Sequence, residues 1–550
     1  MTEKIPRVAI IGAGFSGIAV AVELIDAGLG DVVVFDEADG IGGTWWLNSY
    51  PGAEVDTPSI LYSFSYAPQA WTRNFVRRSE LQQYLASVAN RFGVTERTRF
   101  NTKVSSARWD AVHNEYELTF SDGNRERFDF VVSAVGFLNV PNLPTWPGLD
   151  EFNGPVLHSA RWDPSVGLNG RTVAVIGSGS TAAQLVPGIA DQVDHLLMFQ
   201  REPGWVLPKN SRGLTDSERA AAGNPVVQKI VRASMLWRRE KVQHGLKLLT
   251  PGTHANKAAE ANAREYINSV FAERPDLAEA VTPTYPFGGK RPIMADDLYP
   301  AMLRSNVELI PRAVERITPS GVVDVAGTHH EADVLVLSTG FDTRYLTTLD
   351  VYGTAGNSLQ ATWNGEPEAL LGVLAAGFPN FFMMYGPLTN GGAVASMLEE
   401  QAKYVAAAIG TVVRKNADSI DARPEAVRRF NEIIQQRLAG SAFQDANNYY
   451  KSPSGKVVTQ WSDGVAFYIY MSRTWRRRAW KIERSLRRAD GRRWALPTPR
   501  RLRRIDLRPA LRHPIATFRA VKALQQTDRG NAFASKRFGR VEGPPLIVEG

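Results

Sequence analysis

Two stretches of the chain repeat one pattern of apolar and small residues. Residues 7–17 read RVAIIGAGFSG, residues 171–181 read RTVAVIGSGST, and Ala-rich sequence follows each. A short β-branched run predicts a buried parallel strand, the glycines predict a tight turn, and the Ala-rich sequence predicts a helix. We therefore expect two strand–turn–helix units in one chain.

A second repeat predicts how the two units are connected. Residues 128–137 (FDFVVSAVGF) parallel residues 332–341 (ADVLVLSTGF), since both are apolar runs that end in Gly-Phe. Each is typical of a late strand of a parallel sheet, after which the chain crosses to the other unit, and the Pro-rich residues 140–147 are the expected first crossover. This order predicts an α/β fold with two Rossmann-like domains, the second inserted into the first.

The glycine spacing in the two turns is the fingerprint of a dinucleotide-binding unit. Its positions are Gly12, Gly14 and Gly17 in the first unit, and Gly177, Gly179 and Ala182 in the second. The first glycine permits a tight turn, the second lets backbone N–H groups approach a pyrophosphate, and the third small residue permits close packing of helix on strand. The pyrophosphate lies at the helix N-terminus, where the free N–H groups favour an anion.

The strand after each turn ends in a charged residue of opposite sign. Asp36 lies 24 residues after Gly12, and Arg201 lies 24 residues after Gly177. We interpret the two as occupying the same structural position. A carboxylate there accepts hydrogen bonds from ribose hydroxyls, whereas an arginine suits a ribose 2′-phosphate. The first unit is therefore assigned to FAD and the second to NADPH; the alternative is that Arg201 is an ordinary solvated strand-end residue.

Composition excludes several other kinds of redox protein. The 550 residues are 44% hydrophobic and 22% charged, an ordinary globular balance, and include no cysteine. Disulfides, thiolate metal sites and dithiol flavin reductases are therefore excluded. The eight histidines never occur as H-E-x-x-H, and we expect no metal site. The longest apolar stretch, residues 369–384, is interrupted by Pro379 and Asn380, so we expect a cytoplasmic protein without a membrane span.

The net positive charge of the chain comes from its last 80 residues. Residues 471–550 contain 22 Lys and Arg against 6 Asp and Glu, which leaves 42 basic and 50 acidic residues for the rest of the chain. Residues 474–489 (TWRRRAWKIERSLRRA) predict a basic amphipathic helix with tryptophans, and residues 514–524 a weaker one. Three interpretations stay open, namely an anionic membrane surface, packing on the body or disorder, and another polyanion. No motif indicates a specific nucleic acid.

One segment between the two nucleotide motifs resembles a known family. Phe152, Gly154, His158, Trp162 and Asp163 fit the pattern F-x-G-x-x-x-H-x-x-x-W-[PD]. This pattern resembles the fingerprint of the type I Baeyer–Villiger monooxygenases. In that family the segment is an interdomain linker, so the resemblance implies a structural and gating role for His158. The related monooxygenases that oxygenate nitrogen or sulfur usually carry Tyr or Phe at the place of Trp162.

Other segments agree with this resemblance and imply the site residues. Residues 42–45 and 50–52 resemble the family's flavin-proximal loop, and Lys290-Arg291 resembles its Lys-Arg pair. Trp46-Leu47 departs from the usual Tyr-Trp, which puts the substrate in doubt. The cofactor-binding residues so implied are Gly12, Gly14, Ser16, Gly17, Asp36, Thr44, Trp45, Asp56, Tyr62, Val104, Gly177, Ser178, Gly179, Ser180, Thr181, Gln184, Arg201 and Lys290.

The resemblance implies an enzyme that uses FAD, NADPH and O₂ to convert a ketone into an ester or lactone through a flavin C4a-peroxide. Arg291 and Asp56 are the expected catalytic residues, because a fixed cation stabilises developing oxyanion charge and a carboxylate orients it. Lys290 is expected to face the 2′-phosphate beside Arg201. The alternatives are oxygenation of nitrogen or sulfur, and a membrane-tethered NADPH oxidase or redox sensor. The ketone is not readable from the sequence, although a membrane-seeking tail would suit a lipophilic one.

These assignments predict a division of the chain. Residues 1–140 and 331–470 are the expected parts of the FAD-binding domain, residues 141–330 the NADP-binding domain, and residues 471–550 a basic C-terminal extension. Within the NADP part, residues 211–289 predict a helical insertion, either near the substrate entrance or as a solvated helical cap. Residues 258–274 have helical composition, and Pro275 is expected to end that helix.

Overall fold

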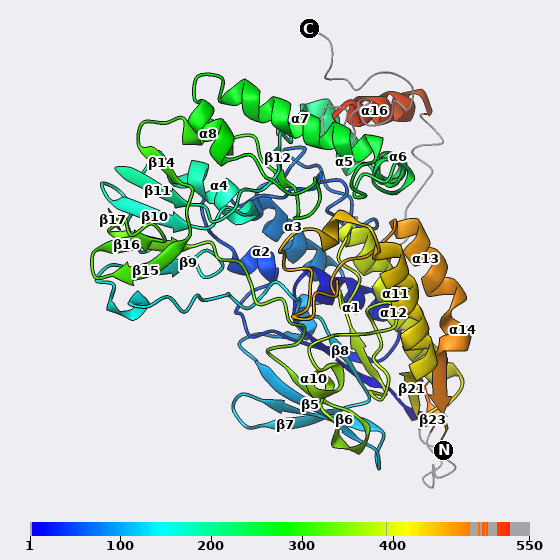
Figure 1. Ribbon diagram of the computed structural model, residues 1–550. Coiled ribbons are helices and arrows are strands. Elements are labelled where there is room, and N and C mark those ends of the chain that lie inside the picture. The colour runs from blue at the N-terminus through cyan, green and yellow to red at the C-terminus, as the bar shows by residue number, and fades with distance from the viewer. Residues whose placement is uncertain are drawn as a thin grey trace.

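Two parallel five-stranded sheets lie in two lobes of the molecule, with helices around and between them (Figure 1). The computed structural model describes residues 3–391, 393–484, 493–495, 498–500, 502–503 and 514–527. Each lobe contains one of the two strand–turn–helix units, so the predicted α/β fold with two Rossmann-like units is confirmed.

The first lobe is built on β2 and the helix that follows it. Its sheet has the order β20-β8-β2-β3-β4, and every neighbouring pair is parallel. A second sheet of order β19-β5-β6-β7 belongs to the same lobe. The strands are β2 Arg7–Ile11, β3 Asp31–Phe35, β4 Thr98–Arg99, β5 Val104–Asp110, β6 Glu115–Phe120, β7 Arg125–Phe128, β8 Phe130–Ser133, β19 Asp350–Tyr352 and β20 Phe381–Met383.

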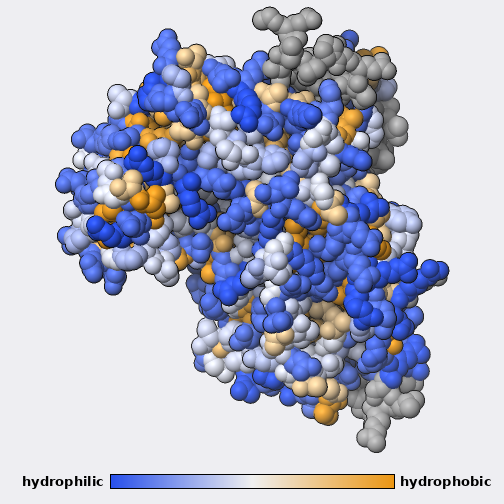
Figure 2. All heavy atoms as spheres, viewed as in Figure 1, coloured by the Kyte–Doolittle hydropathy of each residue, from blue (hydrophilic) through white to orange (hydrophobic). Residues whose placement is uncertain are grey.

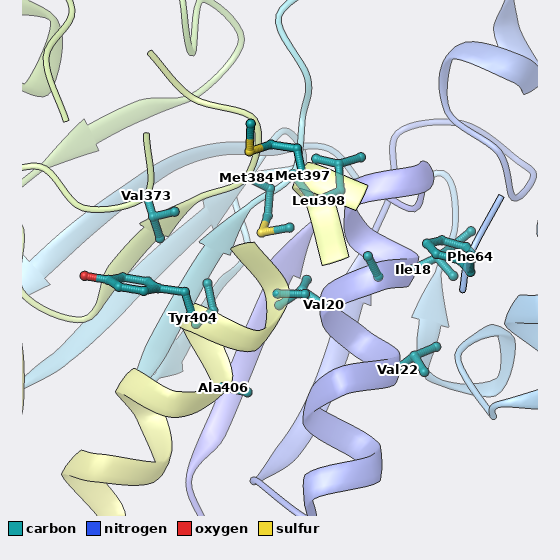
Figure 3. Close-up of a cluster of buried hydrophobic side chains, with 14 of the residues drawn as sticks. Ile18, Val20, Val22, Phe64, Val373, Met384, Met397, Leu398, Tyr404 and Ala406 are labelled. Carbon is teal, nitrogen blue, oxygen red and sulfur yellow. The ribbon is translucent and has the colours of Figure 1, made fainter. Parts of the chain in front are cut away.

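Helix α1 (Phe15–Ala27) is the central buried helix of this lobe and packs against α11 (Val394–Arg414). Ile18, Val20 and Tyr404 are completely buried, and Figure 3 shows these apolar side chains clustered around the two helices. The α1 helix ends at Ala27, and the left-handed backbone of Gly28 (φ 67°) lets the next N–H, that of Leu29, donate back to the Leu24 carbonyl at 2.9 Å. Burial of these apolar faces, rather than helix propensity, stabilises the pair.

The second lobe repeats this arrangement. Its sheet has the order β14-β11-β10-β18-β9 with parallel neighbours throughout, and an antiparallel sheet β15-β16-β17 extends from it. The elements are β9 Val156–His158, β10 Thr172–Ile176, α4 Ser180–Ile189, β11 His195–Phe199, α9 Leu298–Met302, β14 Val307–Ile310, β15 Val314–Thr318, β16 Gly321–Asp324, β17 His329–Glu331 and β18 Val334–Leu337.

Strand pairing corrects one expected boundary. The sequence division assigned residues 331–470 to the FAD part, but β18 pairs with β10 and with β9 of the second sheet. Hydrogen-bond ladders hold β18 between β10 and β9 of the second sheet, so the chain leaves the second lobe only after Leu337.

The register of the two sheets corrects the comparison of Asp36 with Arg201. Ile11 is paired with Phe35 in the first sheet, and Ile176 is paired with Phe199 in the second. The connection is one residue shorter in the second unit, so Asp36 corresponds to Gln200. Arg201 therefore corresponds to Glu37. Counting the same number of residues from the first glycine of each unit does not detect this one-residue difference.

The helical insertion is divided between the two lobes. Helices α5 (Asp216–Gly223) and α6 (Pro225–Glu240) contribute apolar side chains to the core of the first lobe. After a π-helical turn at Lys241–Gly245, α7 (His254–Val270) and α8 (Pro275–Ala280) pack on the second lobe and its neighbouring apolar cluster. The expectation that Pro275 ends a helix over 258–274 is wrong: α7 ends at Val270, and Pro275 begins α8, where its missing N–H costs nothing.

The basic segment after residue 471 packs on the body where the structure describes it. Helix α13 (Val465–Thr474) ends at the first residue of the predicted amphipathic helix, and after the short α14 (Arg476–Ala479) the chain forms β22 (Trp480–Glu483). This strand pairs antiparallel with β21 (Ser419–Ala422). Trp480 is buried and donates from Nε1 to the Tyr404 hydroxyl at 2.6 Å. The prediction of one amphipathic helix over 474–489 is therefore wrong, because the chain is helical there only at Thr474 and in α14 and then forms a ladder with a buried indole. Residues 485–489 lie outside the description.

Further parts of the tail contact the first lobe and the insertion. Arg503 forms ion pairs with Glu23 and Asp26 of α1. Helix α16 (Pro514–Thr527) packs against α5 and α6, with Val521 and Leu524 buried, so the weaker helix prediction for 514–524 is confirmed. The face of the molecule in Figure 2 is mostly hydrophilic. None of the described helices combines the length and the apolar character that crossing a bilayer requires.

Eight further α-helices and strands complete the described elements other than the short 3-10 helices. They are β1 Glu3–Lys4, α2 Thr44–Leu47, α3 Arg78–Arg91, β12 Val206–Leu207, β13 Ile293–Met294, α10 Leu359–Trp363, α12 Pro424–Leu438 and β23 Arg493–Trp494.

Candidate active site

A cavity of about 1060 Å³ lies between the two lobes and is lined by both glycine-rich turns. This volume is at the upper end of the roughly 300–1,000 Å³ range of ligand sites. The structure places these predicted residues on its wall: Gly12, Gly14, Ser16, Asp36, Thr44, Trp45, Asp56, Tyr62, Val104, Gly177, Ser178, Gly179, Ser180, Thr181, Gln184, Arg201, Lys290 and Arg291. Gly17 is the predicted cofactor residue that does not line it.

The first glycine-rich turn lines the cavity with backbone that carries no side chain at Gly12 and Gly14. Gly12 has φ 108°, and its N–H donates to the Phe35 carbonyl at 2.7 Å. A Cβ on Gly12 would lie 2.5 Å from the Ala134 carbonyl oxygen, and a Cβ on Gly17 would lie 1.8 Å from that of Gly12. The turn therefore requires glycine at both positions, and Gly17 serves its packing rather than the cavity wall.

The second turn has the same construction. Gly177 has φ 126°, and a Cβ there would lie 2.3 Å from the Ser338 carbonyl oxygen. A Cβ on Gly179 would meet nothing within 4 Å, so this backbone borders open space at the start of α4. Both turns thus fit a dinucleotide pyrophosphate at a helix N-terminus.

Asp36 holds the first turn while it lines the cavity. Its Oδ2 accepts a hydrogen bond from the Ala13 N–H at 2.5 Å, and its Oδ1 accepts one from Ala38 at 2.8 Å. Burial raises the pKa of this carboxyl group, and the two backbone hydrogen bonds oppose the rise. A carboxylate has further lone pairs for a ribose hydroxyl. The assignment of Asp36 to the FAD ribose stays a prediction.

Aromatic side chains form the wall next to the first turn. Trp45 contacts Tyr62 edge-on at a ring distance of 5.6 Å and donates from Nε1 to its hydroxyl at 3.3 Å. Burial raises the pKa of Tyr62 to about 12, so its phenol is neutral at ordinary pH. This side of the cavity is therefore apolar and suits a flat ring system.

Arg291 and Asp56 form an ion pair in the cavity. The guanidinium donates to Asp56 Oδ2 from Nη2 at 2.6 Å and from Nε at 3.1 Å. Burial opposes ionisation of Asp56, but the charge and hydrogen bonds of Arg291 hold its pKa below the usual range. The same attraction raises the pKa of Arg291 well above its ordinary value. The pair is therefore fully charged, and 41% of the Arg291 side chain is accessible from the cavity.

The two cations expected at the 2′-phosphate have different surroundings. Arg201 is exposed at the cavity wall, and no hydrogen bond or ion pair joins it to another described residue. Lys290 is instead paired with the carboxylate of Glu202, the residue that follows Arg201. Sequence reasoning missed Glu202, although its position next to Arg201 was a visible signal.

The five fingerprint residues lie outside the cavity wall. A Cβ on Gly154 would lie 2.2 Å from the Asp333 carbonyl oxygen, so this glycine permits a close backbone contact with the second lobe. His158 is buried, its Nδ1 accepts from the Ala160 N–H at 3.1 Å, and burial lowers its pKa. Phe152 and Trp162 pack on the second lobe, and Asp163 accepts from Ser165 in a turn. These contacts agree with structural roles.

Gln184 was predicted to bind a cofactor, and in the structure its side chain also joins the two lobes. Its Oε1 accepts from the Tyr50 hydroxyl at 2.9 Å, and its Nε2 donates to the Glu54 carbonyl at 2.9 Å. A Cβ on Gly52 would lie 2.2 Å from the Gln184 carbonyl oxygen. The loop beside the first turn is thus packed directly on α4.

Residues from the last third of the chain complete the cavity. Tyr385, Asn390 and Tyr449 line it, and the Tyr385 hydroxyl donates to Asn390 Oδ1 at 2.5 Å. Asn448 donates from Nδ2 to the Gly289 carbonyl at 2.7 Å, which fixes the backbone just before Lys290. No periodicity or motif spacing in the sequence indicates these contacts, because they depend on how distant loops meet.

Known proteins share this architecture and sequence. Residues 5–215 match the family model described as flavin-binding monooxygenase-like. A Baeyer-Villiger monooxygenase of Streptomyces coelicolor is 38% identical over 468 residues, which cover 84% of this chain and 89% of that protein.

Two solved structures are similar in fold. One is an oxidized steroid monooxygenase bound to NADP, with 29% identity and a TM-score of 0.79 over 87% of this chain and all of that chain. The other is cyclohexanone monooxygenase from Rhodococcus sp. Phi1 bound to NADP⁺, with 28% identity and a TM-score of 0.79 over 88% of this chain and all of that chain. The chain thus belongs to the Baeyer–Villiger group of flavin-binding monooxygenases and is an FAD- and NADPH-dependent monooxygenase.

Proposed function

We propose that this monooxygenase converts a ketone into an ester or lactone, with NADPH and O₂ as co-substrates. The overall balance is ketone, O₂, NADPH and a proton giving ester, NADP⁺ and water. The observation that carries the proposal is the charged Arg291–Asp56 pair in a cavity bordered by both dinucleotide turns. The name of the cyclohexanone monooxygenase, whose substrate is a ketone, supports a ketone substrate here.

FAD, when bound, supplies the redox chemistry that activates oxygen. The first turn, Asp36 and the Trp45–Tyr62 wall are the residues that would hold it. The neutral Tyr62 and its neighbour Trp45 would cover the flavin on this side of the cavity. Where a bound cofactor displaces water, electrostatic interactions within the site are stronger.

Arg291 is the residue placed to stabilise charge on the substrate. When oxygen is inserted beside a carbonyl, the former carbonyl oxygen develops negative charge. A fixed guanidinium that stays protonated at any working pH stabilises such charge. Asp56 holds Nε and Nη2, which leaves the other terminal nitrogen, Nη1, for the substrate oxygen. Asp56 is thus a positioning residue for Arg291, and with it for the nicotinamide.

The second turn and Arg201 would hold NADPH. The open backbone at Gly179 and the start of α4 suit the pyrophosphate, and Arg201, which pairs with none of the described residues, suits the 2′-phosphate. Lys290 is the second cation near this place, although it already pairs with Glu202.

The direct test is product analysis with purified, FAD-loaded protein, NADPH, ¹⁸O₂ and a panel of cyclic and steroidal ketones. We expect an ester or lactone that carries one ¹⁸O atom and a yield matched to the NADPH consumed. Amines and thioethers belong in the same panel. N- or S-oxides without any ester would contradict the proposal, and so would NADPH consumption that yields only hydrogen peroxide.

A further inference from the structure

Glu202 and Lys290 form an ion pair at the place where the nucleotide's ribose is expected. The Lys290 ammonium contacts a Glu202 carboxylate oxygen, and 24% and 38% of the two side chains are exposed. Both residues line the cavity, as does Arg201 directly before Glu202. One cation of the expected phosphate site is therefore already neutralised by an acid of the same chain.

Neighbouring contacts hold the Glu202 backbone and flank the Lys290 ammonium. The Ser178 hydroxyl, in the second glycine-rich turn, donates to the Glu202 carbonyl at 3.1 Å. The Lys290 ammonium lies 5.3 Å from the centre of the Tyr285 ring, whose hydroxyl donates to the carbonyl of Pro203 at 2.9 Å. The pair thus stands beside the turn that would bind the pyrophosphate.

We propose that Glu202 is a specificity-determining residue that lowers the selectivity of this enzyme for NADPH over NADH. The proposal rests on the assignment of Arg201 and Lys290 to the 2′-phosphate. A phosphomonoester carries about −1.5 to −2 charges at neutral pH. Its entry requires Lys290 to leave Glu202 and places the phosphate near a carboxylate, and both effects weaken binding.

The same carboxylate favours the nucleotide that lacks the phosphate. In dinucleotide-binding units an acid near this position accepts the ribose 2′-hydroxyl, whereas an arginine accommodates the 2′-phosphate. This chain places both groups side by side, at Arg201 and Glu202. Arg201 therefore retains NADPH binding, while Glu202 permits NADH to bind with an affinity closer to that of NADPH.

Binding of 2′,5′-ADP and 5′-AMP to the FAD-loaded protein isolates the phosphate from the rest of the cofactor. Dissociation constants from calorimetry give the ratio of the two affinities without any turnover. Glu202→Gln removes the charge, releases Lys290, and is expected to raise the preference for 2′,5′-ADP about tenfold, through a gained charge-assisted hydrogen bond. The affinity for 5′-AMP should stay the same or fall.

A double-mutant cycle separates this effect from general charge and from folding. In the Lys290→Met background, Glu202→Gln should change the affinity ratio much less, because no ammonium remains to be released. Glu273→Gln, an exposed acid after α7, removes the same charge away from the cavity and should leave the ratio unchanged.

An unchanged or lowered preference for 2′,5′-ADP in the properly folded, yellow Glu202→Gln protein would overturn the proposal. An equal loss of affinity for both nucleotides would do the same, because it would make Glu202 a structural support. Neither result depends on a ketone or on an oxygenated product, so failure of the proposed reaction is a separate observation.

Discussion

Both hydrogen bonds from Arg291 to Asp56 end on the same carboxylate oxygen, Oδ2, with Nη2 at 2.6 Å and Nε at 3.1 Å. The guanidinium is therefore held along one edge, while Asp56 Oδ1 is left to the Thr57 hydroxyl at 3.4 Å. Residues 235 positions apart in the chain meet here, one from each lobe. The position of the cation in the cavity thus depends on how the lobes are assembled.

Arg291→Ala should retain FAD and NADPH but lose ester formation. The guanidinium acts on substrate charge that exists only during oxygen insertion, and one such donor is worth ~2.7–4 kcal/mol, or about 10²–10³ in rate. Arg291→Lys should restore little, because an ammonium cannot reproduce the planar fork. Flavin content, NADP⁺ affinity and ester yield per NADPH are the measurements. Wild-type-like ester yields from Arg291→Ala would refute the assignment and direct attention to Lys290.

Gly12→Ala should abolish binding of FAD, whereas Gly179→Ala should weaken only the binding of NADPH. The first places a Cβ 2.5 Å from a backbone oxygen at φ 108°, so the turn cannot form and flavin should be lost. The second meets no atom within 4 Å, so the protein should fold and stay yellow. Its methyl group would occupy the space of the NADPH pyrophosphate. The affinity for NADP⁺ should therefore fall at least tenfold, which corresponds to ~1.4 kcal/mol. Flavin absorbance and NADP⁺ titration test both variants, and unimpaired NADP⁺ binding by Gly179→Ala would move the pyrophosphate elsewhere.

Arg201→Ala should weaken NADPH and leave NADH nearly unchanged. A charge-assisted hydrogen bond contributes ~1.5–3 kcal/mol, so the loss for NADPH should be roughly tenfold to a hundredfold. Steady-state KM values and direct binding with both cofactors measure it. Lys103→Ala, a cation of the cavity wall paired with Glu37, is a matched control. Equal losses for NADPH and NADH would make Arg201 a structural residue.

Trp480→Ala should destabilise the whole protein, since the tail is part of the core here. The indole is 6% exposed and bonded to Tyr404, and loss of a buried Trp side chain costs about 3–5 kcal/mol. Trp237, which is 66% exposed, provides the control, and its replacement by Ala should change stability by less than about 0.5 kcal/mol. Urea unfolding followed by circular dichroism compares the two. A stable, soluble protein lacking residues 475–550 would contradict a structural role of the tail.

Asp421 should make the stability of the fold depend on pH. Burial raises its pKa to about 6, above the ~3.9 of an unfolded Asp, while the N–H groups of Gly377 and Ala422 oppose the rise. The folded protein then binds the proton more tightly, so this group adds stability as pH falls from about 6 to about 4 and removes it as pH rises. In Asp421→Asn the contribution should vanish. Urea unfolding at pH 7 and pH 5 tests this, and identical pH slopes for the two proteins would contradict it.

The sequence by itself determined both nucleotide-binding units. Glycine at Gly12 and Gly177 is required by a positive φ, and at Gly17 by the carbonyl of Gly12 five residues before it. These are local requirements, which are visible as residue types at fixed spacing. The apolar runs around them determined the parallel strands, because a strand buried on both faces reads as a continuous apolar stretch. The family pattern from Phe152 to Asp163 carried the resemblance in the same local way.

Only the tertiary structure decided what depends on distant segments. The pairing of β18 with β9 and β10, the one-residue offset between Asp36 and Arg201, and the burial of Trp480 against Tyr404 follow from strand register and packing. Helical amphipathicity was overruled at Trp480–Glu483, because pairing with β21 satisfied the backbone of this segment while the core buried the Trp480 indole. The Lys290–Glu202 pair joins residues 88 positions apart, and an ion pair of that separation leaves no periodic signal in a chain; it exists because two loops meet at one wall of the cavity.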